Sequence, residues 1–320
     1  MKAPAILYDN DVERLLDMSK AVEAIQLCLR AKSDGRLIAP PRSSVTFEHQ
    51  GALVFTVGGL FNVEGEQNRA GFRVYTTFPE LAGTSANQLV AVWNPSNGSL
   101  LGVIIGEKLG ALRTGAIGGV AIDCLAKVNA MVCGIIGTGR QAEMQLLAAL
   151  TVRPTLREIR VYSRSVEGRS VFAERMSQKT GVRINAVEAA RAAVEGAEVV
   201  ICATNSPRPV IEMDWLARGC HINSVGPKQT DRHELPLEIA QVAALIVTDS
   251  PEQLSGYSTH FLIVSNCGKQ IRDLADIVTG KLSGREDNDA VTLFCSTGLA
   301  GTEVIIADML ISSQQQAVEA

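Results

Sequence analysis

A glycine-rich turn at residues 137–142 is the segment of this sequence best suited to chemistry. It reads Gly-Thr-Gly-Arg-Gln-Ala and contains the spacing GxGxxA. In such a turn the first glycine permits a tight bend, the second lets backbone approach a pyrophosphate, and the alanine allows close helix–strand packing. An apolar strand-like run precedes the turn, and a helix expected to begin near Thr138 would point N–H groups at the anion. The segment predicts a dinucleotide site; a glycine-rich turn in another kind of α/β protein is the alternative.

The end of the next expected strand, at residues 162–165, bears on which dinucleotide binds. An NAD site usually has Asp or Glu at this point to bind the ribose 2′-hydroxyl. The sequence has Tyr-Ser-Arg-Ser instead. Arg164 with the hydroxyls of Ser163 and Ser165 would suit a 2′-phosphate. We therefore expect NADP(H) to be preferred, with NAD(H) as the second cofactor; an exposed turn with an incidental arginine is the alternative.

Two more polar segments follow strand-like runs in the same part of the chain. Residues 203–207 read Ala-Thr-Asn-Ser-Pro, and residues 224–227 read Ser-Val-Gly-Pro. Ligands of parallel α/β sheets lie at the carboxyl ends of the strands. We expect both segments to line the nicotinamide, although their composition also suits ordinary loops.

The apolar pattern predicts the elements that must position these segments. Residues 10–33 have helical spacing, and residues 107–127 are expected to form a helix rich in small residues. Short strand-like runs over residues 43–105, separated by Gly, Asn and Pro clusters, predict a mostly antiparallel β segment. From residue 131 onward strands alternate with helices, which predicts a parallel sheet covered on both faces. The last stretch, from residue 290, is expected to be strand, tight turn and helix.

The composition limits the classes of function. The 320 residues suggest two domains, and 46% hydrophobic with 20% charged residues is an ordinary globular composition. The net charge is -4 and no basic stretch occurs, which argues against nucleic acid or an anionic membrane as a partner. No apolar run approaches the ~20 residues that span a bilayer. The first residues also have acids where a secretory signal has an apolar core.

The cysteines and histidines argue against a metal site. None of the seven cysteines forms a CxxC pair, and the four histidines have no metal-ligand spacing. His221 lies in an apolar run and is expected to be a core residue. Scattered cysteines in odd number are typical of reduced, buried thiols, so we expect a cytoplasmic protein without a bound metal.

Motifs along almost the whole chain are similar to those of the ornithine cyclodeaminase/mu-crystallin family. The most specific is Leu-Arg-Thr-Gly-Ala at residues 112–116, followed by the glycine-rich turn. The resemblance implies an α/β fold. In it, a Rossmann-type doubly wound NAD(P)-binding domain is inserted into a discontinuous α+β substrate-binding and dimerisation domain, so that a homodimer is expected. On this basis the inserted domain covers 121–293, and the other domain covers 1–120 plus 294–320. The remaining matches are at residues 40–42, 71–74, 221–226, 234–235 and 294–300.

Members of this family interconvert an amino acid and its imine by hydride transfer with nicotinamide. The resemblance implies that Arg42, Arg73 and Arg113 bind the carboxylate of a small-molecule amino or imino acid, which suits the two parallel hydrogen bonds of a guanidinium. Each arginine would also suit a salt bridge, and Asn87 is a weaker candidate for a ligand contact. The implied cofactor-binding residues are Thr114, Gly137, Thr138, Gly139, Arg140, Gln141, Ser163, Arg164, Ser165, Ala203, Thr204, Asn205, Val225, Gly226 and Gly298.

Three residues are candidates for a catalytic role. Two of them, Arg73 and Lys228, differ from the residues that the family usually has at these positions, and the third, Asp231, lies three residues after Lys228. The family usually has lysine at position 73, which can move protons, whereas Arg73 stays protonated. Lys228 stands where the cyclodeaminases have a catalytic Asp. Asp231 lies where ketimine-reductase-like members tend to have Asp, and it would suit a proton donor or a turn cap. These changes argue against a standard ornithine cyclodeaminase.

Three functions are compatible with this pattern. The first is NAD(P)H-dependent reduction of a 2-imino acid to an L-amino acid. The imine would be a cyclic ketimine such as pyrroline-2-carboxylate, or one formed from a 2-oxo acid and an amine. The second is a cyclodeaminase-type lyase that uses NAD internally, and the third is a non-catalytic NADPH- or ligand-binding protein. A site rich in cations and poor in bases suits proton delivery to nitrogen, so we favour the first function.

Overall fold

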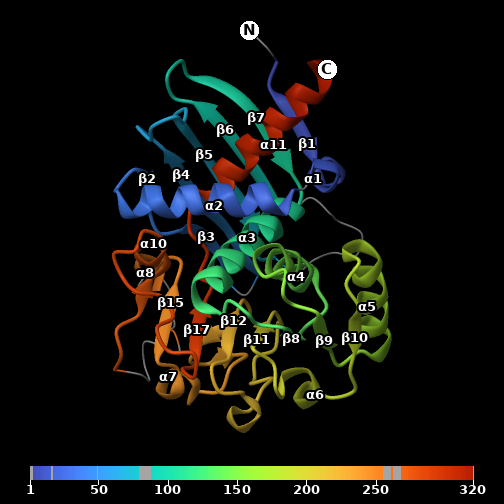
Figure 1. Cartoon of the computed structure of the whole chain (residues 1–320). Helices are drawn as coiled ribbons and strands as arrows, with labels where there is room; N and C mark the ends of the chain where they lie inside the picture. Colours follow the sequence, from blue (N-terminus) through green and yellow to red (C-terminus); the bar gives the residue numbers. More distant parts are fainter. Residues whose placement is uncertain are drawn as a thin grey trace. The chain divides into compact units, whose positions relative to one another are not determined.

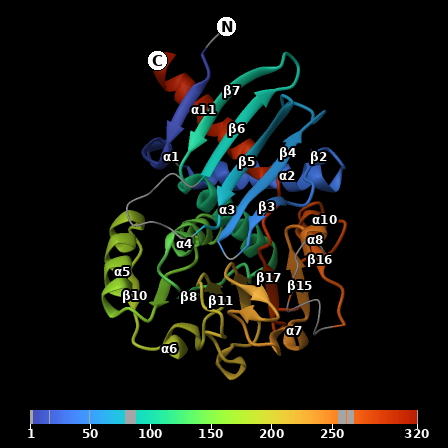
Figure 2. The same cartoon turned by 180° about the vertical axis from the view of Figure 1, so that it is seen from behind.

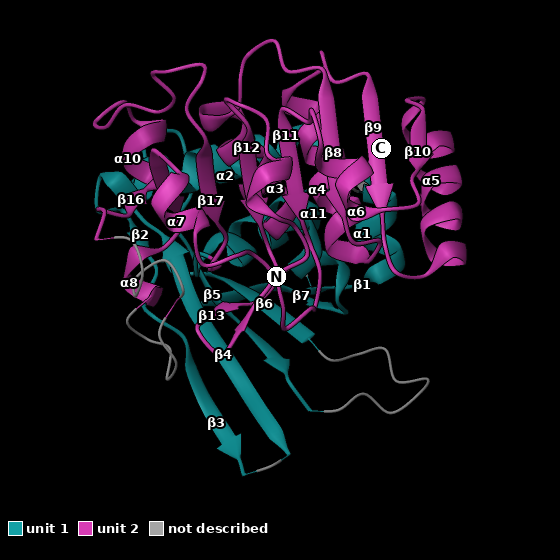
Figure 3. Cartoon of the chain, turned by 90° about the horizontal axis from the view of Figure 1, so that it is seen from below, with its two compact units in different colours: residues 1–113, 299–320 teal, residues 114–298 magenta. Residues whose placement is uncertain are grey.

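The computed structural model describes residues 3–15, 17–48, 50–78, 88–254, 261 and 268–319. His49, Asn87, His260 and Cys267 lie outside these residues. The chain divides into two compact units (Figure 3). Unit 1 comprises Met1–Arg113 and Leu299–Ala320, and unit 2 comprises Thr114–Gly298. Unit 2 therefore interrupts unit 1 in the sequence.

Unit 1 is built on a seven-stranded sheet (Figures 1 and 2). The strands are β1 (Ala5–Tyr8), β2 (Leu37–Ile38), β3 (Ser43–Phe47), β4 (Gly51–Leu60), β5 (Arg69–Thr76), β6 (Gln88–Asn94) and β7 (Ser99–Ile105). Their order is β1-β7-β6-β5-β4-β2, and β3 pairs with β4. The neighbours from β2 to β7 are antiparallel, as the sequence predicts, but β1 runs parallel to β7. We did not expect β1, because four residues carry too little alternation to indicate a strand.

Helices cover one face of this sheet (Figure 1). They are α1 (Asp9–Leu15), α2 (Met18–Ser33), the start of α3 (Lys108–Leu125) and α11 (Thr302–Glu319). Helix α11 packs on β4, β5, β6 and β7 and against α2. The single helix expected over residues 10–33 is wrong, because Asp17 leaves helical geometry and caps α2, accepting a hydrogen bond from the Lys20 N–H at 3.1 Å.

Unit 2 is a Rossmann-type, doubly wound α/β domain. Its sheet comprises β8 (Val132–Ile136), β9 (Glu158–Tyr162), β10 (Ile184–Ala186), β11 (Val199–Cys202), β12 (His221–Ser224), β15 (Leu245–Thr248), β16 (Arg272–Asp273) and β17 (Thr292–Cys295). The strands are all parallel, in the order β10-β9-β8-β11-β12-β17-β15-β16. A short hairpin, β13 (Lys228–Gln229) with β14 (Arg232–His233), lies outside this sheet.

Helices cover both faces of the unit 2 sheet, as the alternation of strands and helices predicts. One apolar core joins the sheet to α3, α4 (Arg140–Val152) and α5 (Val166–Thr180). A second core lies on alternate residues of the same strands and includes α6 (Ala190–Val194) and α7 (Ile239–Val242). The described part of unit 2 also contains the short helices η1 (Met213–Trp215), α8 (Pro251–Leu254) and α10 (Leu274–Val278).

Three further observations concern the described parts of the chain alone. None of their helices combines the length and the apolar character that a membrane span requires. They contain no group of three or more His, Cys, Asp or Glu side chains that could hold a metal ion. The six cysteines among them are free thiols.

Candidate active site

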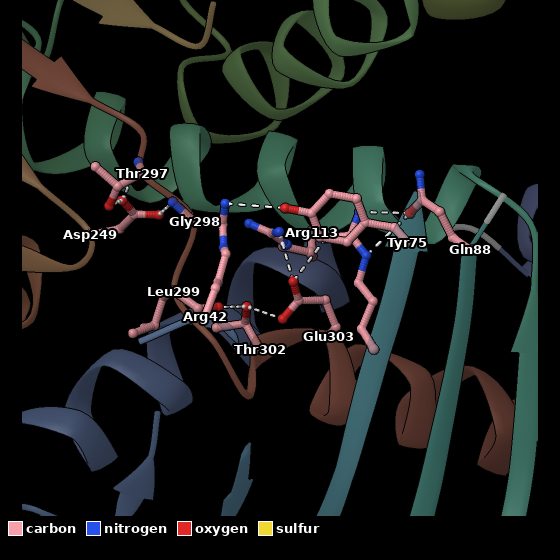
Figure 4. A network of polar contacts seen from close by, with 11 residues as sticks. Arg42, Tyr75, Gln88, Arg113, Asp249, Thr297, Gly298, Leu299, Thr302 and Glu303 are labelled. Atoms are coloured by element: carbon pink, nitrogen blue, oxygen red, sulfur yellow. Dashed lines mark hydrogen bonds and ion pairs between the residues drawn. The ribbon is translucent and has the colours of Figure 1, made fainter. Parts of the chain in front are cut away.

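Unit 1 gathers the three arginines predicted to bind a carboxylate (Figure 4). Arg42 precedes β3, Arg73 lies in β5, and Arg113 lies in α3. The Arg42 Nη1 donates a hydrogen bond to the Tyr75 hydroxyl at 3.4 Å, and the Arg73 guanidinium stacks on the Tyr75 ring, 4.4 Å from its centroid. Three cations from distant parts of the sequence therefore lie in one cluster.

Arg73 is held on several sides. Its Nε and Nη2 both donate to the Gln88 Oε1, at 3.1 and 2.6 Å. Its Nη1 donates to the Glu303 Oε1 at 3.1 Å. Burial lowers the pKa of Arg73, while the charge of Glu303 acts against that shift. Arg73 is thus fixed in place, and its chemistry suits anion binding rather than proton transfer.

Glu303 is the counter-charge of the cluster. Its Oε1 also forms an ion pair with the Arg113 Nη2 at 2.7 Å, so one oxygen atom joins Arg73 and Arg113. Glu303 is 1% exposed. Although burial alone would raise its pKa, the nearby charges of Arg113, Arg73 and Arg42 bring the net pKa below its usual value. The carboxylate is therefore ionised.

The buried polar atoms that have no hydrogen-bond partner among the described residues include the Nε of Arg113 and the Oγ1 of Thr56, a residue that pairs with Arg73 across β4 and β5. Both residues are at least 96% buried. Unsatisfied buried donors are costly. A small ligand with oxygen acceptors would satisfy both atoms.

In unit 2 the glycine-rich turn has the geometry of a dinucleotide site. Gly137 has φ 116°, and a Cβ there would lie 2.3 Å from the Ala203 carbonyl oxygen, so only glycine fits. Gly139 precedes α4 without a side-chain cap, and a Cβ on it would meet no atom within 4 Å. The helix begins at Arg140, two residues later than expected. Open space beside uncapped N–H groups suits an approaching pyrophosphate.

The strand ends predicted to line the nicotinamide are tied together by one buried carboxylate. Glu234, fully buried, accepts from the Ser224 Oγ and the Gly226 N–H through Oε1, at 2.9 and 2.6 Å. Its Oε2 accepts from the Thr204 N–H and Oγ1, at 3.0 and 2.8 Å. A Cβ on Gly226 would lie 2.3 Å from both the Glu234 Oε2 and the Thr204 oxygen. Glu234 therefore fixes the ends of β11 and β12 against each other.

A second buried carboxylate ties together the segments that follow β15 and β17. Asp249, after β15, accepts from the Thr297 N–H and Oγ1 through Oδ1, at 2.7 and 2.8 Å. Its Oδ2 accepts from the Gly298 N–H at 2.9 Å. The predicted cofactor residues after β9, β8, β11, β12 and β17 thus follow five neighbouring strands at their carboxyl ends.

The end of β9 adjoins a pocket whose lining residues include Thr138, Ser165, Glu167 and Arg175. Ser165 caps α5 by accepting from the Gly168 N–H at 3.0 Å, while Arg164 is exposed. Arg175 pairs with Glu143 at 2.7 Å. The lining of this pocket thus includes an acidic side chain, Glu167, which we did not predict from the sequence.

The remaining predicted residues lie in unit 2. Thr114 accepts a hydrogen bond from the Gln145 Nε2 through its carbonyl at 3.0 Å, and the buried Oε1 of Gln141 has no partner among the described residues. Lys228 is buried and its Nζ donates to the Gly226 carbonyl, whereas Asp231 is exposed at the turn of the β13–β14 hairpin.

His221 is a core residue, as the sequence predicts. It is fully buried, with ring nitrogens 2.9 Å from the Thr292 Oγ1 and 2.8 Å from the Asn223 Oδ1. Burial lowers its pKa to about 3, so the ring is neutral at physiological pH. Its role is structural, within a polar network in unit 2.

Sequence reasoning missed three buried carboxylates. Glu303, Glu234 and Asp249 each bind groups from separate elements, and none stands in a chemical motif of its own. The available signals were an acid in the first turn of the last helix and the Glu-Leu match at 234–235. Neither signal specifies a partner.

The profile of the ornithine cyclodeaminase/mu-crystallin family matches residues 2–317. The chain belongs to this family. Its membership agrees with the motifs that carry the resemblance in the sequence, and with the Rossmann-type unit inserted between the two segments of unit 1.

Relatives within the ornithine cyclodeaminase/mu-crystallin family match this chain almost end to end. A Delta(1)-pyrroline-2-carboxylate reductase of Bacillus cereus is 30% identical over 313 residues, 95% of each chain. The structure of the Thermococcus litoralis Delta(1)-pyrroline-2-carboxylate reductase, in complex with NADH and L-proline, is 31% identical with a TM-score of 0.86, covering 98% of both chains. An archaeal alanine dehydrogenase dimer with bound NAD is 27% identical with a TM-score of 0.82, covering 98% of this chain and 97% of that chain.

Proposed function

We propose that the protein is an NAD(P)H-dependent reductase that converts a 2-imino carboxylate into an L-amino acid. The observation that carries this proposal is the arginine cluster, in which Arg73 and Arg113 share Glu303 beside buried donors that lack a partner. Such a cluster suits a carboxylate next to a reacting carbon. Relatives that are pyrroline-2-carboxylate reductases, such as those of Bacillus cereus and Thermococcus litoralis, support the same reaction class.

In this proposal each unit of the chain has a separate task. Arg42, Arg73 and Arg113 bind the substrate carboxylate and orient the C=N carbon. The glycine-rich turn, with the ends of β11 and β12 fixed by Glu234, holds the dinucleotide, which supplies the hydride when bound. Lys228 and Asp231 are the candidate proton donors to nitrogen. A site with three arginines and Lys228 favours delivery of a proton to the substrate nitrogen over removal of one.

The proposal predicts reduction of cyclic ketimines without cyclodeaminase activity. Purified protein should oxidise NAD(P)H with Δ1-pyrroline-2-carboxylate or its six-membered homologue at neutral pH. It should form no appreciable proline or ammonia from ornithine with catalytic NAD, because Lys228 stands where that reaction needs a carboxylate. Proline formation without any imine reduction would support the lyase, and tight cofactor binding with neither activity would support a binding protein.

We also propose that NADPH is preferred over NADH, and that Arg164 contributes to the preference. Replacing Arg164 with Ala should weaken NADPH binding about 10- to 100-fold, the effect of losing a charge-assisted contact worth about 1.5–3 kcal/mol, with little change for NADH. Fluorescence titration of both cofactors measures this. Arg183→Ala, another exposed arginine of unit 2, is the control. Equal affinities of the parent protein for NADPH and NADH would contradict the preference.

We further propose that the chain acts as a homodimer through the sheet of unit 1. All five residues of β3 are exposed, including Val45 and Phe47. Val57 is also exposed and, one residue after Thr56 on β4, points to the opposite face of the sheet from Thr56. Exposed apolar side chains on neighbouring strands are typical of a protein–protein contact. The dimeric alanine dehydrogenase relative supports this proposal.

A further inference from the structure

We propose that Glu303 is a positioning residue that holds Arg73 and Arg113 together as one carboxylate-binding unit. This inference rests on the proposed function and assigns a role to a residue of the last helix. The two guanidinium nitrogens lie 3.1 and 2.7 Å from the same oxygen atom, the Oε1 of Glu303. Glu303 therefore determines where both cations stand.

The need for such a residue follows from the charges. Arg73 and Arg113 are both more than 90% buried, and the charge of Arg113 acts to lower the pKa of Arg73. Two like charges brought together in a buried site repel each other. A carboxylate between them removes that repulsion and still leaves one net positive charge on the three side chains. That charge remains for the carboxylate of a substrate.

The position of Glu303 is itself fixed by close packing at the start of α11. A Cβ on Gly58 would lie 2.5 Å from the Gly301 Cα, so the absence of a side chain lets the helix start lie against β4. The Thr302 Oγ1 then donates to the Leu299 carbonyl at 2.6 Å. Because the backbone just before Glu303 is packed and hydrogen-bonded, the start of α11 places this side chain against Arg73 and Arg113.

Replacing Glu303 with Gln keeps the size of the side chain but removes its charge. The amide has one acceptor oxygen, and its NH2 group repels guanidinium donors. Arg73 would still be held by Gln88, whereas Arg113 would lose the negative charge with which its guanidinium forms an ion pair. The two cations would then no longer face one carboxylate together.

The test compares two imines that differ only in the carboxylate. For Δ1-pyrroline-2-carboxylate, Glu303→Gln should lower kcat/KM about 10- to 100-fold, mainly through KM. For Δ1-pyrroline, the same variant should leave kcat/KM within about threefold of the parent value. This substrate has no carboxylate, so it makes no charge-assisted contact with the arginines that the variant could weaken. Glu303→Asp restores the charge one methylene shorter and should recover part of the loss.

The matched control is Asp308→Asn on the same helix. Asp308 pairs with Arg69 at 2.6 Å, so this variant also breaks an arginine–carboxylate pair of α11 without touching the cluster. It should leave both imines unaffected. An equal loss for both imines in Glu303→Gln, or no loss at all, would overturn the positioning role, as would an Asp variant no better than Gln.

A ligand-binding measurement distinguishes failure of this inference from failure of the proposed function. If the parent protein reduces neither imine, the proposed function fails. The role of Glu303 is then measured by the thermal shift that pyrrole-2-carboxylate produces in the NADPH-loaded protein. The shift should disappear in Glu303→Gln and persist in Asp308→Asn. An unchanged shift in Glu303→Gln, or no shift in the parent protein, would contradict the inference.

Discussion

Replacing Arg113 with Ala is expected to lower kcat/KM for a 2-imino carboxylate by about 10³-fold, which corresponds to about 4 kcal/mol. Arg113 is 4% exposed, and its guanidinium lies 2.7 Å from Glu303. Its removal would take away a proposed carboxylate anchor and leave the buried Glu303 short of positive charge. A substrate carboxylate would then approach a negative group. Steady-state kinetics with cyclic ketimines measures the loss.

Two other variants show whether this effect is specific. Arg113→Lys keeps the charge but loses the planar fork, so turnover should fall by less than in the Ala variant. Arg69→Ala removes an arginine of unit 1 whose partner is Asp308, and it should leave kinetics near those of the parent. The dissociation constant of NAD(P)H should be unchanged in all three. Parent-like turnover in Arg113→Ala would show that this arginine does not bind the substrate.

Replacing Glu234 with Gln should weaken cofactor binding and lower the free energy of unfolding by about 1–3 kcal/mol, the cost of one unsatisfied buried donor. The carboxylate accepts backbone N–H groups on both oxygens, from Gly226 on one and Thr204 on the other. An amide has a single acceptor oxygen. Whichever way it turns, one backbone N–H faces its NH2 group, so the ends of β11 and β12 should separate.

Urea unfolding and NAD(P)H titration measure the two parts of this prediction. Glu238→Gln makes the same chemical change at an exposed position four residues later, and it should alter neither quantity. If Glu234→Gln bound the cofactor as tightly as the parent protein, the ends of β11 and β12 would not depend on this carboxylate.

The parts of the fold that sequence reasoning predicted rest on local patterns. The bend at Gly137 needs only its own backbone and the Ala203 carbonyl beside it, so the motif and the strands around it suffice to indicate it. The predicted cofactor segments lie at neighbouring strand ends because parallel α/β sheets place them there. Local reasoning was less successful at boundaries, where Asp17 divides one expected helix into two.

The carboxylates of the site could not be predicted in the same way. Glu303 is an acid in the first turn of a helix, a position that usually indicates favourable interaction with the helix dipole. Its actual partners lie 230 residues away in β5 and 190 residues away in α3. Such a pairing depends on which face of the sheet receives α11. The local pattern of the last helix contains no information about that face.

The division of unit 1 in the sequence has a consequence for how the protein is made. Unit 2 is one continuous segment, so it can fold as it leaves the ribosome, whereas unit 1 needs residues 299–320, which are synthesised after all of unit 2. Until α11 docks on β4–β7, Arg73 and Arg113 have no Glu303 beside them. The cluster of Arg73, Arg113 and Glu303 is therefore completed only after the whole of unit 2 has been synthesised, and a chain that stops before residue 299 carries unit 2 without this cluster.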